Sequence, residues 1–142
     1  MPEPDIAFTT LGPAAGERFQ ALRRELGVTS FGINLITLQP RERGRIHAHE
    51  QQEEVYLVLD GELTLVLGED EEHTVKRDGV VRVGPAVRRQ LVNRGPERLV
   101  LLALGGAGEH VGRDGRAWES WGESGPGRSP QEIPLPGDLP SG

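Results

Sequence analysis

The feature that most constrains this chain is a series of short β-type runs, rich in Val, Ile and Leu, between residues 31 and 104. Turn-forming residues interrupt these runs about every 8–12 residues, and this spacing is typical of an all-β sandwich or barrel. Roughly seven or eight antiparallel strands are enough to close a double-sheet roll and remove its exposed edges. The predicted strands cover residues 33–38, 45–49, 54–59, 62–67, 80–83, 88–92 and 98–104.

Turn signals between the runs predict how the strands connect. Asp60-Gly61 joins two runs directly. This dipeptide favours a type I′ hairpin, because both central residues of that turn need a positive φ. A second hairpin is expected within residues 68–72, and a third at Asp78-Gly79, which leads into the run at 80–83.

The two ends of the chain differ from this central part. The i, i+3, i+7 spacing of Phe19, Leu22 and Leu26 predicts a short helix, which the following glycine ends. The last 20 residues are rich in proline and glycine, which favours an irregular tail. We therefore expect an N-terminal extension at 1–30, a barrel core at 31–105, and a C-terminal extension and tail at 106–142.

The charge balance opposes a nucleic-acid partner. The chain has 22 acidic and 16 basic side chains and a formal net charge of −6, whereas nucleic-acid affinity comes largely from basic groups that face phosphates. All the basic residues except Lys76 are arginine. Genomic base composition explains such a bias, and some arginines are also expected to act as rigid forks that bind carboxylates.

Neither a membrane nor a secretory role is expected. The longest unbroken apolar run, residues 99–104, is far too short to cross a bilayer. The N-terminus lacks the pattern of a signal peptide. The chain has no cysteine, which excludes disulfides and thiolate metal sites and fits a reducing compartment. We expect a soluble cytoplasmic protein.

The residues that carry chemistry are concentrated around two histidines. Successive side chains of a strand alternate between its faces, so Arg45, His47 and His49 project the same way. Glu54 opens the next predicted strand, which can fold back beside the first. Two imidazoles and one carboxylate that converge on a point form the facial triad used for divalent first-row metals.

This segment resembles the first motif of the cupin superfamily, G(X)5HXH(X)3–4E(X)6G. The chain reads His47-Ala48-His49, then four residues, Glu54, six residues and Gly61, although the leading glycine is displaced. Glu53 satisfies the shorter spacing, but the step to Gly61 favours Glu54. The resemblance implies a cupin double-stranded β-helix, or jelly-roll barrel, with a metal on His47, His49 and Glu54.

The second cupin motif, G(X)5PXG(X)2H(X)3N, is altered in this chain. With Asn93 as the final asparagine, Arg89 occupies the place of the usual histidine ligand, and Gly79 and Pro85 lie one place from their expected positions. The resemblance covers about residues 30–105. An arginine cannot bind a metal at neutral pH.

The substitution leaves two arrangements open. In the first, one divalent transition ion (iron, manganese, nickel, zinc or copper) binds the triad, and Arg89 is offset to hold an anionic ligand. In the second, the guanidinium takes the place of the metal and pairs with Glu54, which leaves a metal-free pocket. Either arrangement neutralises a buried carboxylate, which is costly to leave unpaired. Tyr56 and Arg45 share faces with the triad residues and are further candidates for ligand binding.

The fold alone does not choose among functions. One function is a metal-dependent enzyme, of oxygenase, isomerase or lyase type, that acts on a small anionic or carbohydrate-like metabolite. The other is a non-catalytic module that binds a small molecule. Outside the triad, His73 is expected to be solvated, His110 to lie in a loop, and Trp118 and Trp121 to anchor the returning tail.

A second copy of the chain is the expected macromolecular partner. If Glu54, Tyr56 and Val58 face the cavity, the alternate residues Val55, Leu57 and Leu59 face outward. A strand that is apolar on both faces is normally covered on both sides. Twofold dimers are the commonest soluble assemblies, so we expect a homodimer with these residues at its interface.

Overall fold

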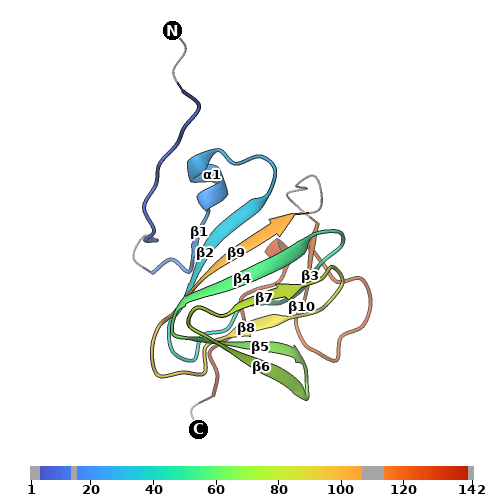
Figure 1. The fold of residues 1–142 in the computed structure, drawn as a ribbon. Coiled ribbons are helices and arrows are strands. Elements are labelled where there is room, and N and C mark those ends of the chain that lie inside the picture. Colours follow the sequence, from blue (N-terminus) through green and yellow to red (C-terminus); the bar gives the residue numbers. More distant parts are fainter. Residues whose placement is uncertain (1–3, 14–15, 107–113, 141–142) are drawn as a thin grey trace.

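The computed structural model describes residues 4–13, 16–106 and 114–140, which form two β-layers packed face to face (Figure 1). Strands that follow one another in the chain mostly alternate between the layers, as in a jelly roll. The predicted all-β barrel is confirmed. The first sheet, in the order β1-β2-β9-β4-β7, contains β1 (Phe19–Gln20), β2 (Gly32–Leu38), β9 (Leu99–Gly106), β4 (Glu53–Asp60) and β7 (Val80–Val83).

The second layer holds the remaining strands. Its three-stranded sheet has the order β6-β5-β8, and β3 pairs with β10 beside it. Isolated bridges from Arg43 to Val92 and from His47 to Arg89 connect the β3 region to the β8 region. The strands of this layer are β3 (Ile46–His49), β5 (Glu62–Gly68), β6 (Glu71–Lys76), β8 (Gln90–Val92) and β10 (Gly115–Trp118).

Two of the three predicted hairpins are corners between the layers. β4 pairs with β7 and β9, whereas β5 pairs with β6 and β8, so the hairpin prediction at Asp60-Gly61 was wrong. Gly61 has a φ of 75°, and a Cβ there would collide with the carbonyl oxygen of Arg98. Asp78-Gly79 likewise connects β6 to β7 in the other layer, and only the hairpin between β5 and β6 is confirmed.

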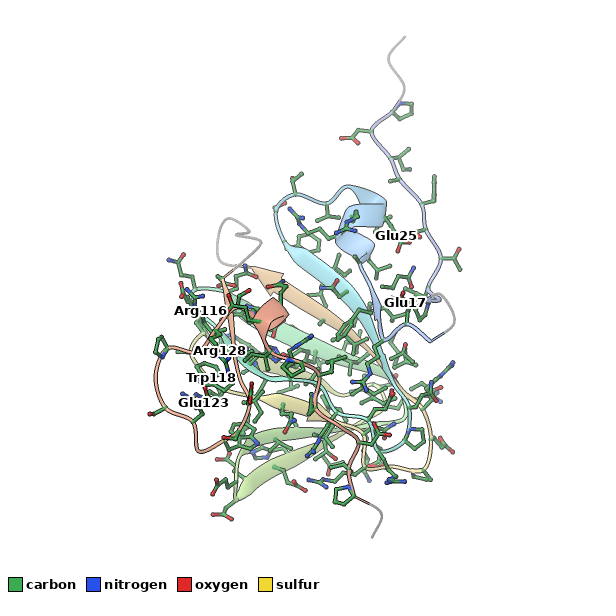
Figure 2. All side chains as sticks on the ribbon, turned by 180° about the vertical axis from the view of Figure 1, so that it is seen from behind. Glu17, Glu25, Arg116, Trp118, Glu123 and Arg128 are labelled. Carbon is green, nitrogen blue, oxygen red and sulfur yellow. The ribbon has the colours of Figure 1, made fainter. Side chains whose placement is uncertain are left out.

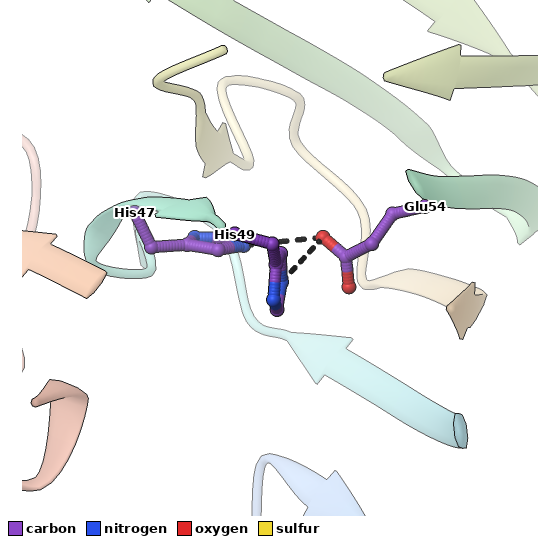
Figure 3. Close-up of side chains that lie close together, drawn as sticks. All are labelled: His47, His49 and Glu54. Carbon is purple, nitrogen blue, oxygen red and sulfur yellow. Dashed lines mark hydrogen bonds and ion pairs between the residues drawn. The ribbon is translucent and has the colours of Figure 1, made fainter. Parts of the chain in front are cut away.

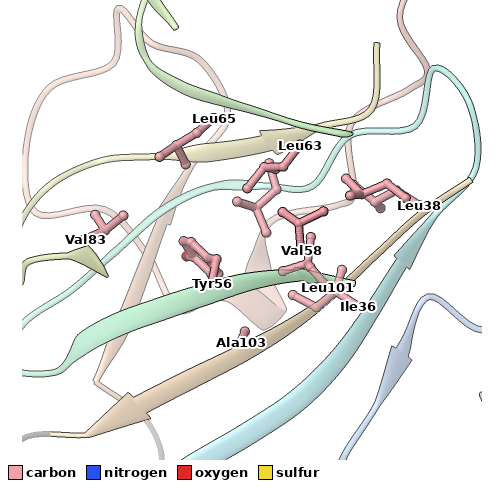
Figure 4. Close-up of a cluster of buried hydrophobic side chains, with 11 residues drawn as sticks. Ile36, Leu38, Tyr56, Val58, Leu63, Leu65, Val83, Leu101 and Ala103 are labelled. Carbon is pink, nitrogen blue, oxygen red and sulfur yellow. The ribbon is translucent and has the colours of Figure 1, made fainter. Parts of the chain in front are cut away.

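Side chains from both layers meet in one apolar core (Figure 4). On β4, Tyr56 and Val58 point into this core and are 1% and 0% exposed, whereas Val55 and Leu57 are only partly buried. This alternation agrees with the faces expected from the sequence. The core residues are Ile36, Leu38, Tyr56, Val58, Leu63, Leu65, Val83, Leu91, Leu99, Leu101 and Ala103.

The flanking segments contribute to the barrel. The predicted helix is α1 (Leu22–Leu26), which ends at Gly27 in a left-handed conformation, but Phe19 belongs to β1 and not to the helix. In the C-terminal extension, β10 pairs with β3, and the short 3-10 helix η1 (Pro130–Glu132) follows. Within the described ranges, no helix is long and apolar enough to cross a membrane. A cytoplasmic location stays a prediction.

The aromatic residues near the end of the chain anchor it on the outer side of β3. Trp118, labelled in Figure 2, is 6% exposed and packs against Ile46 and Ala48, and the partly buried Trp121 packs against the same cluster. The Arg88 guanidinium lies 3.8 Å from the centroid of the Trp118 ring, close enough for a cation–π contact. The expectation that these tryptophans are packing anchors agrees with this arrangement.

Candidate metal centre

The predicted triad assembles from both layers of the barrel. His47 and His49 lie on β3 with the intervening Ala48 turned into the cluster around Trp118, and Glu54 reaches them from β4 in the other layer. This alternation leaves the two imidazoles on the face of β3 that is directed into the barrel. His47, His49 and Glu54 are the group whose potential ligand atoms all lie within 4.8 Å of one another.

The three side chains meet at a single carboxylate oxygen (Figure 3). Glu54 Oε1 lies 3.3 Å from His47 Nε2 and 3.2 Å from His49 Nε2. Two ligands that each bind a metal at about 2.1 Å, at an angle of about 90–110°, are about 3.0–3.4 Å apart. The spacing therefore fits a shared metal ion. Glu53 points outward and pairs with Arg82, so the structure places Glu54 and not Glu53 in the cluster.

Both imidazoles are oriented by acceptors at their other nitrogen. His49 Nδ1 lies 2.8 Å from Asp114 Oδ1, and His47 Nδ1 lies 3.2 Å from the carbonyl oxygen of Arg45. An imidazole that donates its Nδ1 proton keeps a lone pair on Nε2 unless it gains a second proton. Two nitrogen lone pairs and a carboxylate oxygen then point at one another. A metal ion between them, or a second proton on each ring, makes such an arrangement favourable.

The pKa values follow from these contacts. Burial of Glu54 would raise its pKa, but the hydrogen bonds and charges of His47 and His49 outweigh burial and hold the pKa well below its ordinary value. Burial would lower the pKa of His49, but Glu54 and Asp114 together raise it. The carboxylate is therefore ionised over a wide pH range, as a metal ligand must be.

Asp114 is a functional residue that the sequence did not reveal. It lies just before β10, is 7% exposed, and its Oδ2 accepts hydrogen bonds of 2.9 Å from the backbone N–H groups of Gln51 and Gln52. A carboxylate that holds the outer nitrogen of a histidine ligand fixes the ring orientation. No local signal marks Asp114, because it is 65 residues from His49 in the chain. His110 lies outside the described residues, and His73 is exposed and pairs with Glu71.

Arg89 and Tyr56 lie behind Glu54. Arg89 is 0% exposed, its Nη2 is 3.6 Å from Glu54 Oε1, and its Nη1 donates to the carbonyl of Val87 at 2.8 Å. This distance allows an ion pair but not a hydrogen bond. The Tyr56 hydroxyl donates to Glu54 Oε1, and burial together with the Glu54 charge raises the Tyr56 pKa well above its ordinary value.

Two adjoining cavities open over the triad. The larger, of about 400 Å³, is lined by His47, His49 and Glu54 with apolar side chains such as Leu38 and Leu91. Arg45 lines it too, while its Nε donates to the carbonyl of Ile133 at 2.7 Å. Arg89 and Tyr56 are not among the residues that line either cavity. Contact of these two with a ligand stays a prediction, and their visible role is to surround Glu54.

The smaller cavity, of about 320 Å³, forms a more polar mouth. His49 and Glu54 line it, and so do Arg23 and Arg24 of α1. Pro130 and Gln131 line both cavities and Ser129 lines the smaller one, so the C-terminal tail forms part of the site. The other residues that line this smaller cavity include Asn34, Gln52, Gly105, Asp114 and Gly115.

Comparison with known proteins agrees with this fold. The sequence model of the Cupin domain family matches residues 34–105. No curated protein matches the chain significantly. Among solved structures, the chain is similar to a protein of Acidithiobacillus ferrooxidans provisionally named a sugar phosphate isomerase. The identity is 28% and the TM-score 0.58, over 68% of this chain and 60% of that one.

Two further structures share the fold. A sugar phosphate isomerase of the cupin superfamily from Silicibacter pomeroyi is 23% identical with a TM-score of 0.61, over 72% of this chain and 65% of that one. A Klebsiella pneumoniae protein with a double-stranded β-helix domain is 16% identical with a TM-score of 0.61, over 78% and 91% of the two chains. The present chain thus spans less than two thirds of the length of either isomerase structure.

Proposed function

The chain belongs to the cupin family, and from this premise we propose that it binds one divalent transition metal ion through His47, His49 and Glu54. Iron, manganese, nickel, zinc and copper ions all accept imidazole nitrogen and carboxylate oxygen as ligands. Three protein ligands leave further coordination positions open. Since His49 and Glu54 line both cavities, a small molecule held there can reach the metal.

The convergence of three acceptor atoms supports this proposal most directly. His47 Nε2, His49 Nε2 and Glu54 Oε1 face one another at the spacing of adjacent metal ligands, while both Nδ1 atoms already face oxygen acceptors. A metal ion satisfies all three at once. Without it, each ring needs a second proton on Nε2 to face the carboxylate oxygen favourably.

The ligand we propose is a small anionic or carbohydrate-like metabolite. The mouth carries two arginines, three side-chain amides and the Ser129 hydroxyl, a lining suited to polar oxygen-rich molecules. The likeness to the Acidithiobacillus protein named as a sugar phosphate isomerase supports the same class. The bound metal would supply a Lewis acid that polarises a ligand oxygen, and the protein residues would hold and orient that ligand.

A non-catalytic binding module is the second candidate. Apart from the triad and Asp114, the described residues that line the cavities include no carboxylate, histidine or tyrosine. Turnover would therefore depend on the metal or its bound water for acid–base chemistry. In this alternative, Arg89 balances the Glu54 charge without a metal, which its 3.6 Å approach to Oε1 supports.

Elemental analysis of protein purified without added metal tests the proposal. We expect about one transition ion per chain in the wild type and in the control His73→Ala, which removes an exposed histidine. His47→Ala/His49→Ala should lose the ion. A wild type that stays metal-free after growth in metal-supplemented medium, or a double variant that keeps its metal, would contradict the proposal.

A turnover assay separates the enzyme from the binding module. Metal-loaded protein is incubated with aldose and ketose phosphates, and isomer formation is followed by NMR. Conversion that is lost in His47→Ala/His49→Ala would support catalysis. Binding without conversion would support the non-catalytic module.

A further inference from the structure

The polar mouth above the triad contains two cationic side chains, those of Arg23 and Arg24. Arg23 and Arg24 both line this cavity, and the Nε of Arg23 is buried without a hydrogen-bond partner. Among the residues that the structure describes, no carboxylate pairs with either guanidinium. By contrast, Arg18 pairs with Glu42 and Arg82 with Glu53.

Among the described residues, the acidic groups that line the mouth are already engaged. Glu54 contacts both histidines, and Asp114 binds His49 Nδ1 and two backbone N–H groups. They are therefore poor partners for the arginines. The two guanidiniums therefore leave positive charge at the mouth that a bound anion can balance.

We propose that this mouth is a phosphate-binding subsite in which Arg23 and Arg24 hold the phosphate of a small phosphorylated metabolite. The opposite, oxygen-bearing end of that molecule reaches the metal, a step that rests on the function proposed above. Asn34, His49 and Glu54 line both cavities, so a single ligand can extend from the arginines to the triad.

A phosphate suits this pair of residues better than a carboxylate does. A phosphate monoester is a dianion near neutral pH with three acceptor oxygens, and it balances two guanidiniums. A carboxylate carries one charge and is satisfied by a single bidentate arginine.

Calorimetric titration of the metal-loaded protein with matched probes tests the subsite. The probes are ribose 5-phosphate, ribose, ribonate and inorganic phosphate. We expect ribose 5-phosphate to bind at least tenfold more tightly than ribose, and inorganic phosphate to compete with it. Arg23→Gln should weaken the binding of ribose 5-phosphate about tenfold. Arg24→Gln should weaken this binding less, because Arg24 is exposed.

The variants are chosen to separate the two proposals. Arg77→Gln, which changes an exposed arginine far from the mouth, is the control and should bind like the wild type. Metal content should be unchanged in Arg23→Gln and Arg24→Gln. If Arg23→Gln does not fold, Arg23→Lys keeps the charge but not the fork, and Arg24→Gln tests the subsite independently.

Each outcome has a clear meaning. If ribose 5-phosphate binds no better than ribose, if ribonate binds more tightly than ribose 5-phosphate, or if folded Arg23 and Arg24 variants bind like the wild type, the phosphate subsite is refuted while metal binding stands. If the wild type lacks metal but phosphate binding still depends on Arg23, the subsite stands and the metal proposal fails.

Discussion

At the scale of single residues, Asp114 controls how His49 is presented. Asp114→Ala removes the acceptor of His49 Nδ1 and leaves two backbone N–H groups without a partner. We expect metal affinity to fall about 10–100-fold and stability to fall by about 1–3 kcal/mol. Chelator competition and thermal melting measure the two effects. Asp114→Asn keeps an oxygen at this place, so its metal affinity and stability should fall less. The control Asp70→Ala, in an exposed turn, should keep both metal affinity and stability.

Arg89 is the residue at which this chain departs from its family's second motif. Its Nη2 is 3.6 Å from the carboxylate oxygen that faces both histidines, so its charge competes with a metal for Glu54. Arg89→His replaces this cation by a neutral nitrogen donor. We expect tighter metal retention in chelator competition.

Arg89→Met separates charge from ligation, because it removes the cation without adding a donor. A gain in metal affinity that is larger in Arg89→His than in Arg89→Met would identify the new histidine as a ligand. Equal gains would identify relief of charge competition as the cause. Unchanged metal affinity in both variants would show that the guanidinium does not influence the site.

The sequence could identify the triad but not its support. His47, His49 and Glu54 follow from strand alternation and a short spacing, both of which are local properties. Asp114 could not be found, because its partner lies 65 residues away and the strand after it begins with a glycine and an arginine. The burial of Arg89 depends on both layers closing over it, which no local pattern encodes.

At the scale of elements, three alternating arginines hold the C-terminal tail against the barrel. Arg41, Arg43 and Arg45 donate to the backbone carbonyls of Leu139, Gly137 and Ile133, at 2.7, 2.8 and 2.7 Å. Some arginines do bind carboxylates, as expected from the composition, but these three bind the backbone of a tail rich in proline. The irregular tail thereby acquires a fixed course in which Pro130 and Gln131 line both cavities.

Release of this tail should open the site. In Arg43→Ala/Arg45→Ala the tail loses two hydrogen bonds to charged donors, each worth about 1.5–3 kcal/mol. We expect the chelator to remove the metal several-fold faster than from the wild type. Arg94→Ala, which breaks an exposed pair with Glu72, is the control. Equal release rates in all three proteins would mean that the tail does not cover the metal.

Strands were predictable from the sequence, but their partners were not. The runs at 62–67 and 80–83 match β5 and β7 within a residue or two. Asp60-Gly61 correctly marked a turn, yet the chain crosses there from one layer to the other. Whether a turn folds a strand back or sends it across the core depends on packing between layers, not on the dipeptide.

At the scale of the whole molecule, the outer surface of the first sheet carries an apolar patch on β4 and β9, beside the exposed pair of Glu53 and Arg82. Val55 and Leu57 of β4 lie opposite Leu104 and Leu102 of β9, and all four are partly buried. An apolar sheet face that borders water is unusual, since antiparallel sheets generally place polar residues on their solvent side. The buried alternation of Tyr56 and Val58 fixes these residues on the outside.

We expect two copies of the chain to cover this face by forming a twofold dimer. A stable dimer buries about 800 Å² on each partner, and a self-complementary apolar face meets that need without a second surface. Light scattering at micromolar concentration should give twice the chain mass of 15.5 kDa. Leu57→Glu, which places a charge in this face, should give the monomer, whereas Thr74→Glu on exposed β6 should stay dimeric. A wild type at the monomer mass would defeat the dimer itself, and a folded Leu57→Glu that still elutes as a dimer would move the interface to another face.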